Sequence, residues 1–254
     1  MFREKNILFF KVDDCWFDKE IYNKSKAPIT IYHGPDVDRL NYGIVIKEYT
    51  FMIDLSQTEE EIMSKFDRKG LVYSIRHAEK KGYTSKRASE AEKNDFVKFF
   101  NRFAEKKGIP KVTARELADM DVYISYSPEN ALIGGTAFVK SADKKIYRYK
   151  HGANVYSTNA NDMLLWSAIK AARREGYELF DLGGIRITDD KDSYYYRHYK
   201  YKEKFGGEIV AFYTCVKASV IFLPIISLLN FVVRVFFKSD FNSLINFINK
   251  IKHI

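Results

Sequence analysis

The chain of 254 residues is 46% hydrophobic and 16% aromatic, so it can bury a core in one large or two small domains and is not a disordered chain. Its formal net charge of +9 and pI near 9.2 favour an anionic partner such as a nucleic acid, a nucleotide phosphate or a membrane surface. A generally basic soluble enzyme has the same balance, so the charge alone does not choose among these classes.

The two cysteines, Cys15 and Cys215, lie far apart and form no CxxC pair. This spacing indicates neither a disulfide framework nor a zinc site, and it suits a reducing compartment. The apolar run ILFF near the N-terminus is too brief for the core of a signal peptide. We therefore expect a cytoplasmic protein, or one that is peripheral on the inner face of the cell membrane.

The first fifty residues have the composition of strands rather than of a complete domain. Strands are expected at Asn6–Val12, at Ile29–His33 and at Gly43–Asp54, the last as one strand or two. We expect residues 1–50 to form a remnant N-terminal subdomain.

A helical pattern begins at Ser56, where Ser56 and Glu59 form a potential capping box. After Gly70, the segment LVYSIRHAEKKG predicts a second helix with Gly82 at its C-terminal end. One face of this region is basic and contains Lys69, Tyr73, Arg76 and Lys80. Such a face is either solvated or in contact with phosphate groups.

The middle of the chain predicts one amphipathic helix, at residues 94–107, and an antiparallel meander. The expected strands of the meander are 122–126, 131–140 and 146–153. The pair Gly134 and Gly135 inside the second strand indicates a bulge or the close approach of another backbone.

The segment from 163 to 208 contains the features around which we expect the site to form. A helix at 163–176 leads to a strand at Tyr177–Leu182, which ends in Gly183 and Gly184. Strand, helix and strand in this order predict a βαβ crossover, so the sheet is mixed. A further helix is expected at 194–204, where a second glycine pair stops it.

The last forty residues are apolar and basic. Residues 218–233 carry no charge, but these sixteen residues are fewer than the roughly 20 that span a bilayer. Residues 218–233 and 241–254 both have amphipathic helical patterns. We expect 216–254 to be a membrane-associating tail; a re-entrant or spanning segment and a pair of dimerisation helices are the alternatives.

The sequence lacks the common motifs of hydrolases, metalloenzymes and nucleotide-binding proteins, namely GxSxG, HExxH, GxGxxG and GxxxxGK[ST]. Asp189, Asp190 and Asp192 lack the ligand spacing of a calcium loop, so a solvated loop and no metal site are expected. The remaining chemistry is group transfer, in which the substrates bring the reactive groups and the protein supplies position and charge.

Three blocks of the sequence resemble the Fem-type aminoacyltransferases, which make the peptide cross-bridges of peptidoglycan. They are IDLSQTEEEIMSKF...YSIRHAEKKGY at 53–83, YRYKHGANVYSTNANDMLLWSAIKAARREGYELFDLGGI at 147–185 and YKEKFGGEIV at 201–210. The resemblance implies a GNAT-like α/β fold, a mixed sheet flanked by helices, in a transferase domain at 51–215. It also implies transfer of an aminoacyl group from aminoacyl-tRNA, as co-substrate without a separate cofactor, to an amine of a lipid- or nucleotide-linked envelope precursor.

The resemblance further implies roles for single residues. Lys202 would stabilise the donor ester and the oxyanion that develops on it, unless it is a surface lysine on a Tyr-rich turn. Asp181 would be catalytic, or would hold the glycine turn by hydrogen bonds. Trp166 matches an aromatic residue of the family and also suits a core. The residues expected to bind substrate are Arg76, Lys80, Lys150, Tyr156, Asn161, Trp166, Gly183, Gly184, Phe205 and Gly206.

The chain also departs from the family pattern. About fifty residues stand where a full-size member has a first GNAT-like domain, no long helical arm is present, and the apolar tail is an addition. Two other functions stay open. One is an acyl-CoA-dependent N-acyltransferase on an envelope or capsular sugar, although the loop VYSTNAND has no glycine where such enzymes cradle a pyrophosphate. The other is a catalytically silent module that binds tRNA or anionic lipid through its charge.

Overall fold

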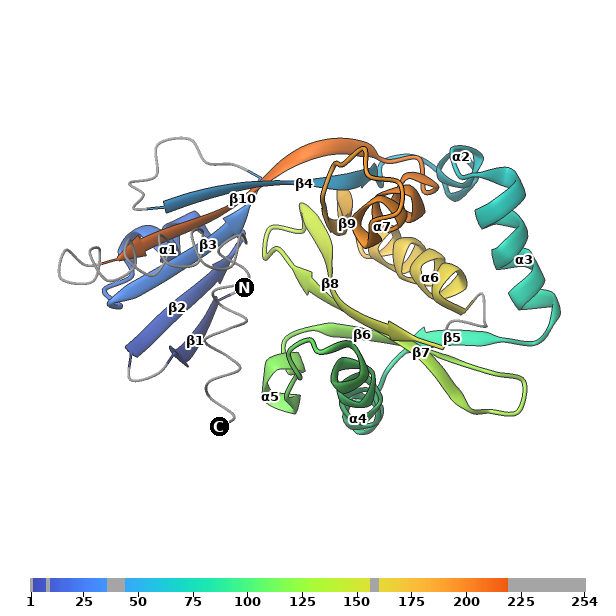
Figure 1. Cartoon of the computed structure of the whole chain (residues 1–254), viewed down its shortest axis with the longest axis horizontal. Helices are drawn as coiled ribbons and strands as arrows, with labels where there is room; N and C mark the ends of the chain where they lie inside the picture. Colours follow the sequence, from blue (N-terminus) through green and yellow to red (C-terminus); the bar gives the residue numbers. More distant parts are fainter. Residues whose placement is uncertain (1, 8–9, 36–43, 156–159, 219–254) are drawn as a thin grey trace. The chain divides into compact units, whose positions relative to one another are not determined.

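The computed structural model describes residues 2–7, 10–35, 44–155 and 160–218. The chain forms two compact units, one of residues 1–48 with 211–254 and one of residues 49–210 (Figure 1). The predicted tail lies outside the described residues from 219 onward. Within the described ranges, no helix is both long and apolar enough to cross a bilayer.

Among the described residues, the first unit contains three whole strands, parts of two more and one short helix. They are β1 (Phe2–Ile7), β2 (Phe10–Trp16), α1 (Lys19–Lys24), β3 (Ile29–Gly34), the part of β4 (Ile44–Asp54) that ends at Glu48 and the part of β10 (Glu208–Ala218) that begins at Ala211. β1 is antiparallel to β2, β2 is parallel to β3, and β3 is antiparallel to β10. Strand β10 and helix α1 are not among the elements that the sequence pattern predicts.

The single strand predicted at Asn6–Val12 is wrong, because this segment contributes to two antiparallel strands. Ile7 pairs with Phe10 in the register between β1 and β2. Val12 and Cys15 of β2 are completely buried. Cys15 belongs to a small buried cluster together with Tyr22, Tyr32 and Cys215, and both cysteines are free thiols.

The second unit is built on a mixed sheet. In spatial order its strands are β4 (Ile44–Asp54, from Tyr49 onward), β9 (Leu179–Ile185), β8 (Ile146–Asn154), β7 (Leu132–Lys140), β6 (Asp121–Tyr126) and β5 (Thr84–Arg87). β8 and β9 are parallel and the other neighbours are antiparallel. The predicted meander and the βαβ crossover from β8 to β9 are therefore confirmed, whereas β5 was not predicted.

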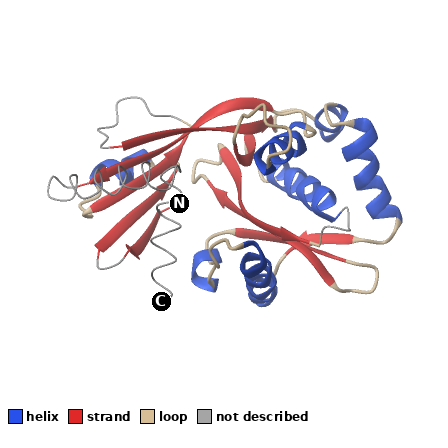
Figure 2. Cartoon of the chain, viewed as in Figure 1, coloured by secondary structure: helices blue, strands red, loops and turns tan. Residues whose placement is uncertain are grey.

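Helices cover both faces of this sheet (Figure 2). They are α2 (Glu59–Ser64), the π-helix η1 (Arg68–Val72), α3 (Tyr73–Lys80), α4 (Glu90–Lys107), α5 (Ala114–Leu117), α6 (Ala160–Arg174) and α7 (Tyr194–Glu203). α4 and α5 lie on one side of the sheet, and α6 and α7 lie on the other (Figures 1 and 2). The helices predicted at 94–107, 163–176 and 194–204 are all present, with boundaries that differ by a few residues.

The capping box at the start of α2 is in a different register from the one predicted. Thr58 Oγ1 accepts a hydrogen bond from Glu61 N at 3.2 Å, and the Glu61 carboxylate accepts one from Thr58 N at 2.8 Å. The amide of Ser56 instead donates to Asp54 Oδ1 at 2.9 Å. Both Ser56 and Thr58 have a glutamate three residues later, and the turn at Asp54 decides between them.

The glycine pair in β7 adjoins a register shift, where Ser125 pairs with Gly134 and Tyr126 with Leu132, so a bulge lies here, as predicted. The pair also allows the close approach of a side chain. A Cβ atom built on Gly135 would lie 2.4 Å from the ring of Phe96 in α4. Any larger residue there would push α4 away from the sheet.

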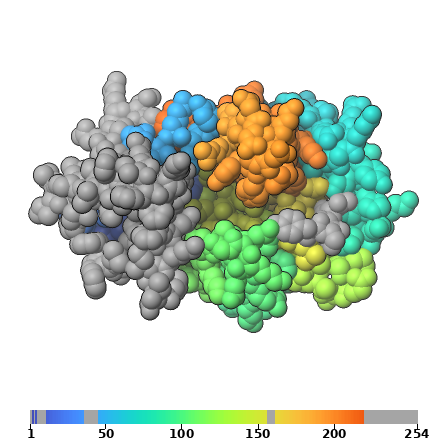
Figure 3. Space-filling view, viewed as in Figure 1, coloured from blue at the N-terminus to red at the C-terminus, as the bar shows by residue number. Residues whose placement is uncertain are grey.

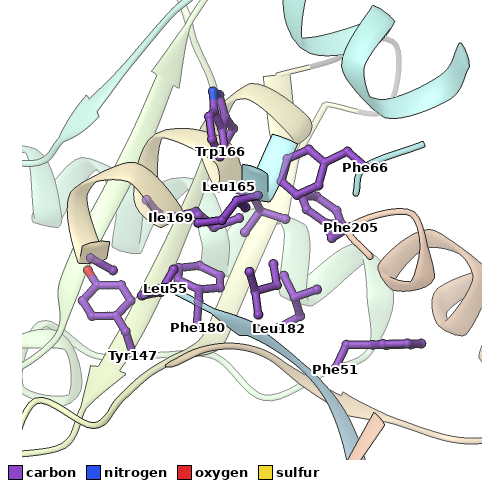
Figure 4. Packing of buried hydrophobic residues seen from close by; sticks show 14 of the residues in the cluster. Phe51, Leu55, Phe66, Tyr147, Leu165, Trp166, Ile169, Phe180, Leu182 and Phe205 are labelled. Carbon is purple, nitrogen blue, oxygen red and sulfur yellow. The ribbon is translucent and has the colours of Figure 1, made fainter. Parts of the chain in front are cut away.

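The core of the second unit lies between the sheet and α6 (Figure 4). Leu165 and Ile169 of α6 are buried against the strands, and each such side chain contributes about 1.5–3 kcal/mol to folding. The ring of Phe66 meets Trp166 and Phe205 edge-on, each at 5.4 Å between centroids. The core therefore connects α6 to the chain just after α2 and just after α7.

Candidate functional site

Near the end of β9, Gly183 and Gly184 lie where the pairing with β4 shifts register between Thr50 and Met52, a bulge that we call the glycine turn. Gly183 has φ +82°, in the left-handed region, and a Cβ built on it would lie 3.2 Å from the carbonyl oxygen of Tyr149 and 3.4 Å from Lys202 Nζ. A Cβ on Gly184, in contrast, would meet no atom within 4 Å. β9 thus continues to Ile185 and does not end at Leu182 as predicted, and its bulge contains a tightly packed glycine followed by one that borders open space.

Lys202 of α7 is buried against this turn, with 5% of its surface exposed. Its ammonium donates hydrogen bonds to the carbonyl oxygens of Gly183 and Gly184, both at 2.9 Å, and lies 5.6 Å from the ring centroid of Tyr149. A lysine has three N–H donors, so one is left after these two bonds to the described chain. Lys202 is thus not a surface lysine, which was the alternative interpretation of the sequence.

Burial lowers the pKa of Lys202 from 10.5 to about 7. The positive charge of Arg148 lowers this pKa further, and the negative charge of Asp181 opposes both effects. Near neutral pH the group is therefore divided between ammonium and amine. The ammonium retains one N–H donor, and it can stabilise a developing negative charge beside Gly184, which borders open space.

Asp181 stabilises the glycine turn through hydrogen bonds. It is fully buried and accepts hydrogen bonds from Gly183 N at 2.7 Å, from the hydroxyl of Thr50 and from Arg148, with which it forms an ion pair. Thr50 also donates to the carbonyl oxygen of Gly183 at 2.8 Å. These are the hydrogen bonds expected of a structural role, and they make Asp181 a positioning residue for the turn to which Lys202 binds.

Sequence reasoning missed Thr50 and Arg148. Arg148 is the register partner of Asp181 on the parallel neighbour β8, and its side chain is only 7% exposed. An arginine between two tyrosines in a predicted strand is a signal that could have identified it, because a buried guanidinium requires an anionic partner. No comparable signal marks Thr50.

Helix α7 is held in place by interactions on both sides of Lys202. Ser193 caps its N-terminus by accepting a hydrogen bond from Tyr196 N at 3.1 Å. Near its C-terminus, Tyr201 lies edge-on to Phe205 and donates to Asp162 Oδ1 of α6 at 2.8 Å. The lysine is therefore carried on a helix whose two ends are fixed.

The Tyr201–Asp162 hydrogen bond is part of a polar cluster that connects three helices. Ser74 of α3 donates to Asp162 Oδ2 at 2.5 Å, and Asn161 Nδ2 donates to the hydroxyl of Tyr201 at 2.5 Å. Burial and the Asp162 carboxylate raise the pKa of Tyr201 well above its usual value of 10. Asn161, predicted to bind substrate, thus contacts α7, and its role towards substrate stays a prediction.

His198 lies one helical turn before Lys202 on α7. Burial, together with the positive charge of Lys202, lowers its pKa to about 3. Its ring stacks on Tyr194 with 5.7 Å between centroids. His198 is therefore a neutral, packed histidine at ordinary pH.

The structure brings together four of the predicted site residues: Lys202, Asp181, Gly183 and Gly184. Trp166 and Phe205 are core residues with 4% and 1% of their surface exposed.

The other predicted residues have different settings. Arg76 and Lys80 are exposed on α3, and Lys150 is half-buried on β8. Gly206, with φ +64°, packs against the backbone of Lys65. Tyr156 lies outside the described residues. Among the described residues, no group of histidine, cysteine and acidic side chains is arranged to hold a metal ion.

The sequence matches no protein-family model and no curated protein. Solved structures are similar to it in fold. A crystal structure of FemX has a TM-score of 0.62 and 13% identity, covering 84% of this chain and 82% of that chain. The C-terminal domain of a putative lysylphosphatidylglycerol synthetase from Agrobacterium fabrum has a TM-score of 0.59 and 14% identity, covering 92% and 85%.

A third similar structure is L-PGS from Bacillus licheniformis, with a TM-score of 0.59 and 12% identity, covering 89% of this chain and 84% of that chain. At such identities the likeness establishes the fold. The chain therefore has the mixed, helix-flanked α/β fold that its resemblance to the Fem-type proteins predicts.

Proposed function

We propose that this protein is an aminoacyltransferase that moves an aminoacyl group from aminoacyl-tRNA to an amine of a cell-envelope precursor. The observation that carries the proposal is the buried Lys202, bonded to two carbonyls of a glycine turn beside open space. The fold that the chain shares with FemX and with lysylphosphatidylglycerol synthetase supports the same chemistry.

In the proposed reaction the amine nitrogen of the acceptor attacks the ester carbonyl carbon of the donor. The carbonyl oxygen becomes an oxyanion, which the remaining N–H donor of Lys202 stabilises. The intermediate then collapses: the amide bond is complete, the ester C–O bond breaks, and the ribose oxygen leaves. The proton lost by the attacking nitrogen goes to that ribose oxygen within the substrate complex, so no side chain is needed as a net acceptor.

The protonated form of Lys202 is the active one in this mechanism. Because its pKa is lowered to about 7, the active fraction falls as the pH rises through that value. The acceptor amine has the opposite requirement, since only its neutral form attacks. We therefore expect a bell-shaped dependence of the transfer rate on pH, with its alkaline limb assigned to Lys202.

The acceptor and its location are finer parts of the proposal. The similarity in fold extends equally to FemX and to a lysylphosphatidylglycerol synthetase, so the hydroxyl of phosphatidylglycerol is the second acceptor to consider. Residues 216–254 would bring the protein to the inner face of the membrane, where lipid-linked acceptors reside. The predicted partners are thus aminoacyl-tRNA, an envelope precursor or lipid, and the membrane surface.

A reconstituted transfer assay tests the proposal. Purified protein is incubated with tRNA charged with radiolabelled amino acids and, separately, with nucleotide-linked precursor, lipid-linked precursor or phosphatidylglycerol vesicles, and the product mass is measured. We expect a mass increase of one amino acid on one acceptor. Lys202→Ala should lower kcat by about 10²–10³-fold, the usual loss when one oxyanion donor is removed, whereas Lys204→Ala, an exposed lysine at the same helix end, should not.

Two outcomes of this assay would contradict the proposal. Transfer from acetyl-CoA but not from charged tRNA would identify an acyl-CoA-dependent enzyme. Salt-sensitive binding of tRNA or anionic lipid, with no turnover on any acceptor, would identify a non-catalytic binding module.

A further inference from the structure

A groove of about 470 Å³ lies on the second unit, away from the glycine turn, between α2 and the start of α3. Its lining is amphipathic. Met63 and Val72 provide apolar surface, and Arg68 and Arg76 provide two guanidinium groups. Glu60 and Ser64 complete the lining.

Neither guanidinium is neutralised by the protein. In the part of the chain that the structure describes, Arg68 and Arg76 form no ion pair and no side-chain hydrogen bond, although Glu60 lines the same groove. Both side chains are exposed. A guanidinium has five N–H donors in a planar fork that matches phosphate oxygens, so two unpaired ones in a single groove favour an anionic, phosphate-bearing occupant.

An unusual turn creates this arrangement. η1 is a π-helix in which Val72 N donates to the carbonyl oxygen of Asp67 at 3.0 Å. A Cβ on Gly70 would lie 2.4 Å from the Asp67 carboxylate, which itself accepts a hydrogen bond from Lys69 N at 3.2 Å. A side chain at position 70 would therefore displace the Asp67 carboxylate, and Arg68 within this turn and Arg76 after it line the same groove.

An exposed aromatic pair adjoins the groove on α3. Tyr73 is 62% exposed, and its ring stacks on His77 with 5.5 Å between centroids and 16° between planes. Tyr73 precedes Arg76 by three residues, so both side chains lie on neighbouring positions of one helix face. Lys80 continues this face towards the end of α3.

We propose that this groove and the adjoining face of α3 bind the single-stranded end of an RNA. Arg68 and Arg76 hold a phosphodiester group, and Tyr73 provides a platform on which a base stacks. The apolar lining accommodates the sugar between them. An anionic lipid would also bind the guanidinium groups through its phosphate. However, only two apolar side chains of the groove could contact its acyl chains, and a lipid has no aromatic ring to stack on Tyr73.

The chain beside the groove is hydrogen-bonded to the end of α7, the helix that carries Lys202. Asp67 N donates to the carbonyl oxygen of Lys204 at 2.8 Å, so the start of η1 is bonded to the residue that follows α7. In Figure 3 the segments around residues 60–80 and around 200 adjoin on one surface. The inference rests on the proposed function to this extent: the RNA is taken to be the donor, whose esterified end would reach Lys202 from the groove.

Fluorescence anisotropy with a labelled 12-nucleotide single-stranded RNA tests the inference without any transfer reaction. The full-length protein is compared with Arg68→Gln/Arg76→Gln and with a matched double variant, Arg102→Gln/Arg115→Gln, which removes the same charge from exposed positions of α4 and α5. We expect the groove variant to bind at least about tenfold more weakly. The slope of log K against log salt should become less steep by about 0.7, because the two arginines hold one phosphodiester group and each lost phosphate contact contributes about 0.7 for single strands.

Variants of Tyr73 distinguish the contribution of base stacking to RNA binding from that of charge. Tyr73→Ala should weaken binding by about tenfold while leaving the salt slope unchanged, and Tyr73→Phe should bind like the wild type. Equal weakening by the two double-arginine variants would overturn the inference, because it would show that only net charge matters. Wild-type binding by Tyr73→Ala would overturn it as well.

The same variants are tested on vesicles of phosphatidylglycerol and phosphatidylcholine. If the groove variant lost vesicle binding but kept RNA binding, the groove would be a lipid site and the inference would be wrong. Lys202→Ala should bind the RNA as the wild type does. Retained RNA binding with no transfer would refute the proposed function alone, and unchanged RNA affinity in the groove variants of an active transferase would refute the groove alone.

Discussion

Replacing Lys202 by methionine should change the pH dependence of folding in a specific direction. The two side chains have similar length, so the contact with Tyr149 is retained while the charge is lost. The unfolded chain has a lysine pKa near 10.5, and the folded protein lowers it to about 7. A depressed pKa in the folded state means that folding expels the proton between these two values.

The sign follows from counting protons. Between about pH 7 and 10.5 the unfolded wild type holds a proton that the folded wild type lacks, so its stability rises with pH in this window. Below pH 7 Lys202 is protonated in both the folded and the unfolded state, so the full free-energy cost of burying the ammonium lowers the stability of the wild type. At about 1.36 kcal/mol per pKa unit, wild-type stability relative to Lys202→Met should rise by about 3 kcal/mol between pH 6 and pH 9.5.

Urea unfolding at several pH values measures this difference. Trp16→Phe in both proteins leaves Trp166, which packs against Phe66 in the second unit, as the only tryptophan and hence a reporter of that unit. The control is Lys204→Met, which removes an exposed charge two residues away and should follow the wild type. Parallel pH profiles for the wild type and Lys202→Met, within about 1 kcal/mol, would refute the claim that the ammonium is desolvated.

Two further changes have predictable effects on stability. Asp181→Ala leaves the buried guanidinium of Arg148 without its anion and should lower the free energy of unfolding in urea by about 3–5 kcal/mol. A double variant that also carries Arg148→Met should recover part of this stability, and the absence of any recovery would argue against the ion pair. Gly206→Ala should destabilise the protein more than Gly108→Ala in thermal unfolding. The two glycines have φ of +64° and +63°, so either substitution costs about 1–2 kcal/mol for the left-handed backbone, but only a Cβ at 206 would clash, 2.4 Å from the carbonyl oxygen of Lys65. Equal losses of stability would contradict this, because they would mean that the Lys65 backbone moves aside at no cost.

Local patterns in the sequence predict much of the second unit. Apolar spacing locates α4 and α6, a glycine pair follows the end of α7, and strand–helix–strand order predicts the parallel pair β8 and β9. These features depend on residues close to one another in the chain, so periodicity and turn chemistry are enough to predict them. The same locality explains the error at Asn6–Val12, since an apolar run does not reveal where the chain turns back on itself.

The chemical state of the site depends on contacts that no local pattern contains. The hydroxyl of Thr50 reaches Asp181 across 131 residues, and Arg148 reaches the same carboxylate only because the register of β8 with β9 sets them opposite each other. The groove beside α3 likewise requires the fold of η1 against the end of α7. The sequence by itself determined that a lysine follows a strand with two adjacent glycines; only the tertiary structure decided that this lysine is buried, because burial and charge pairing depend on which distant residues surround it.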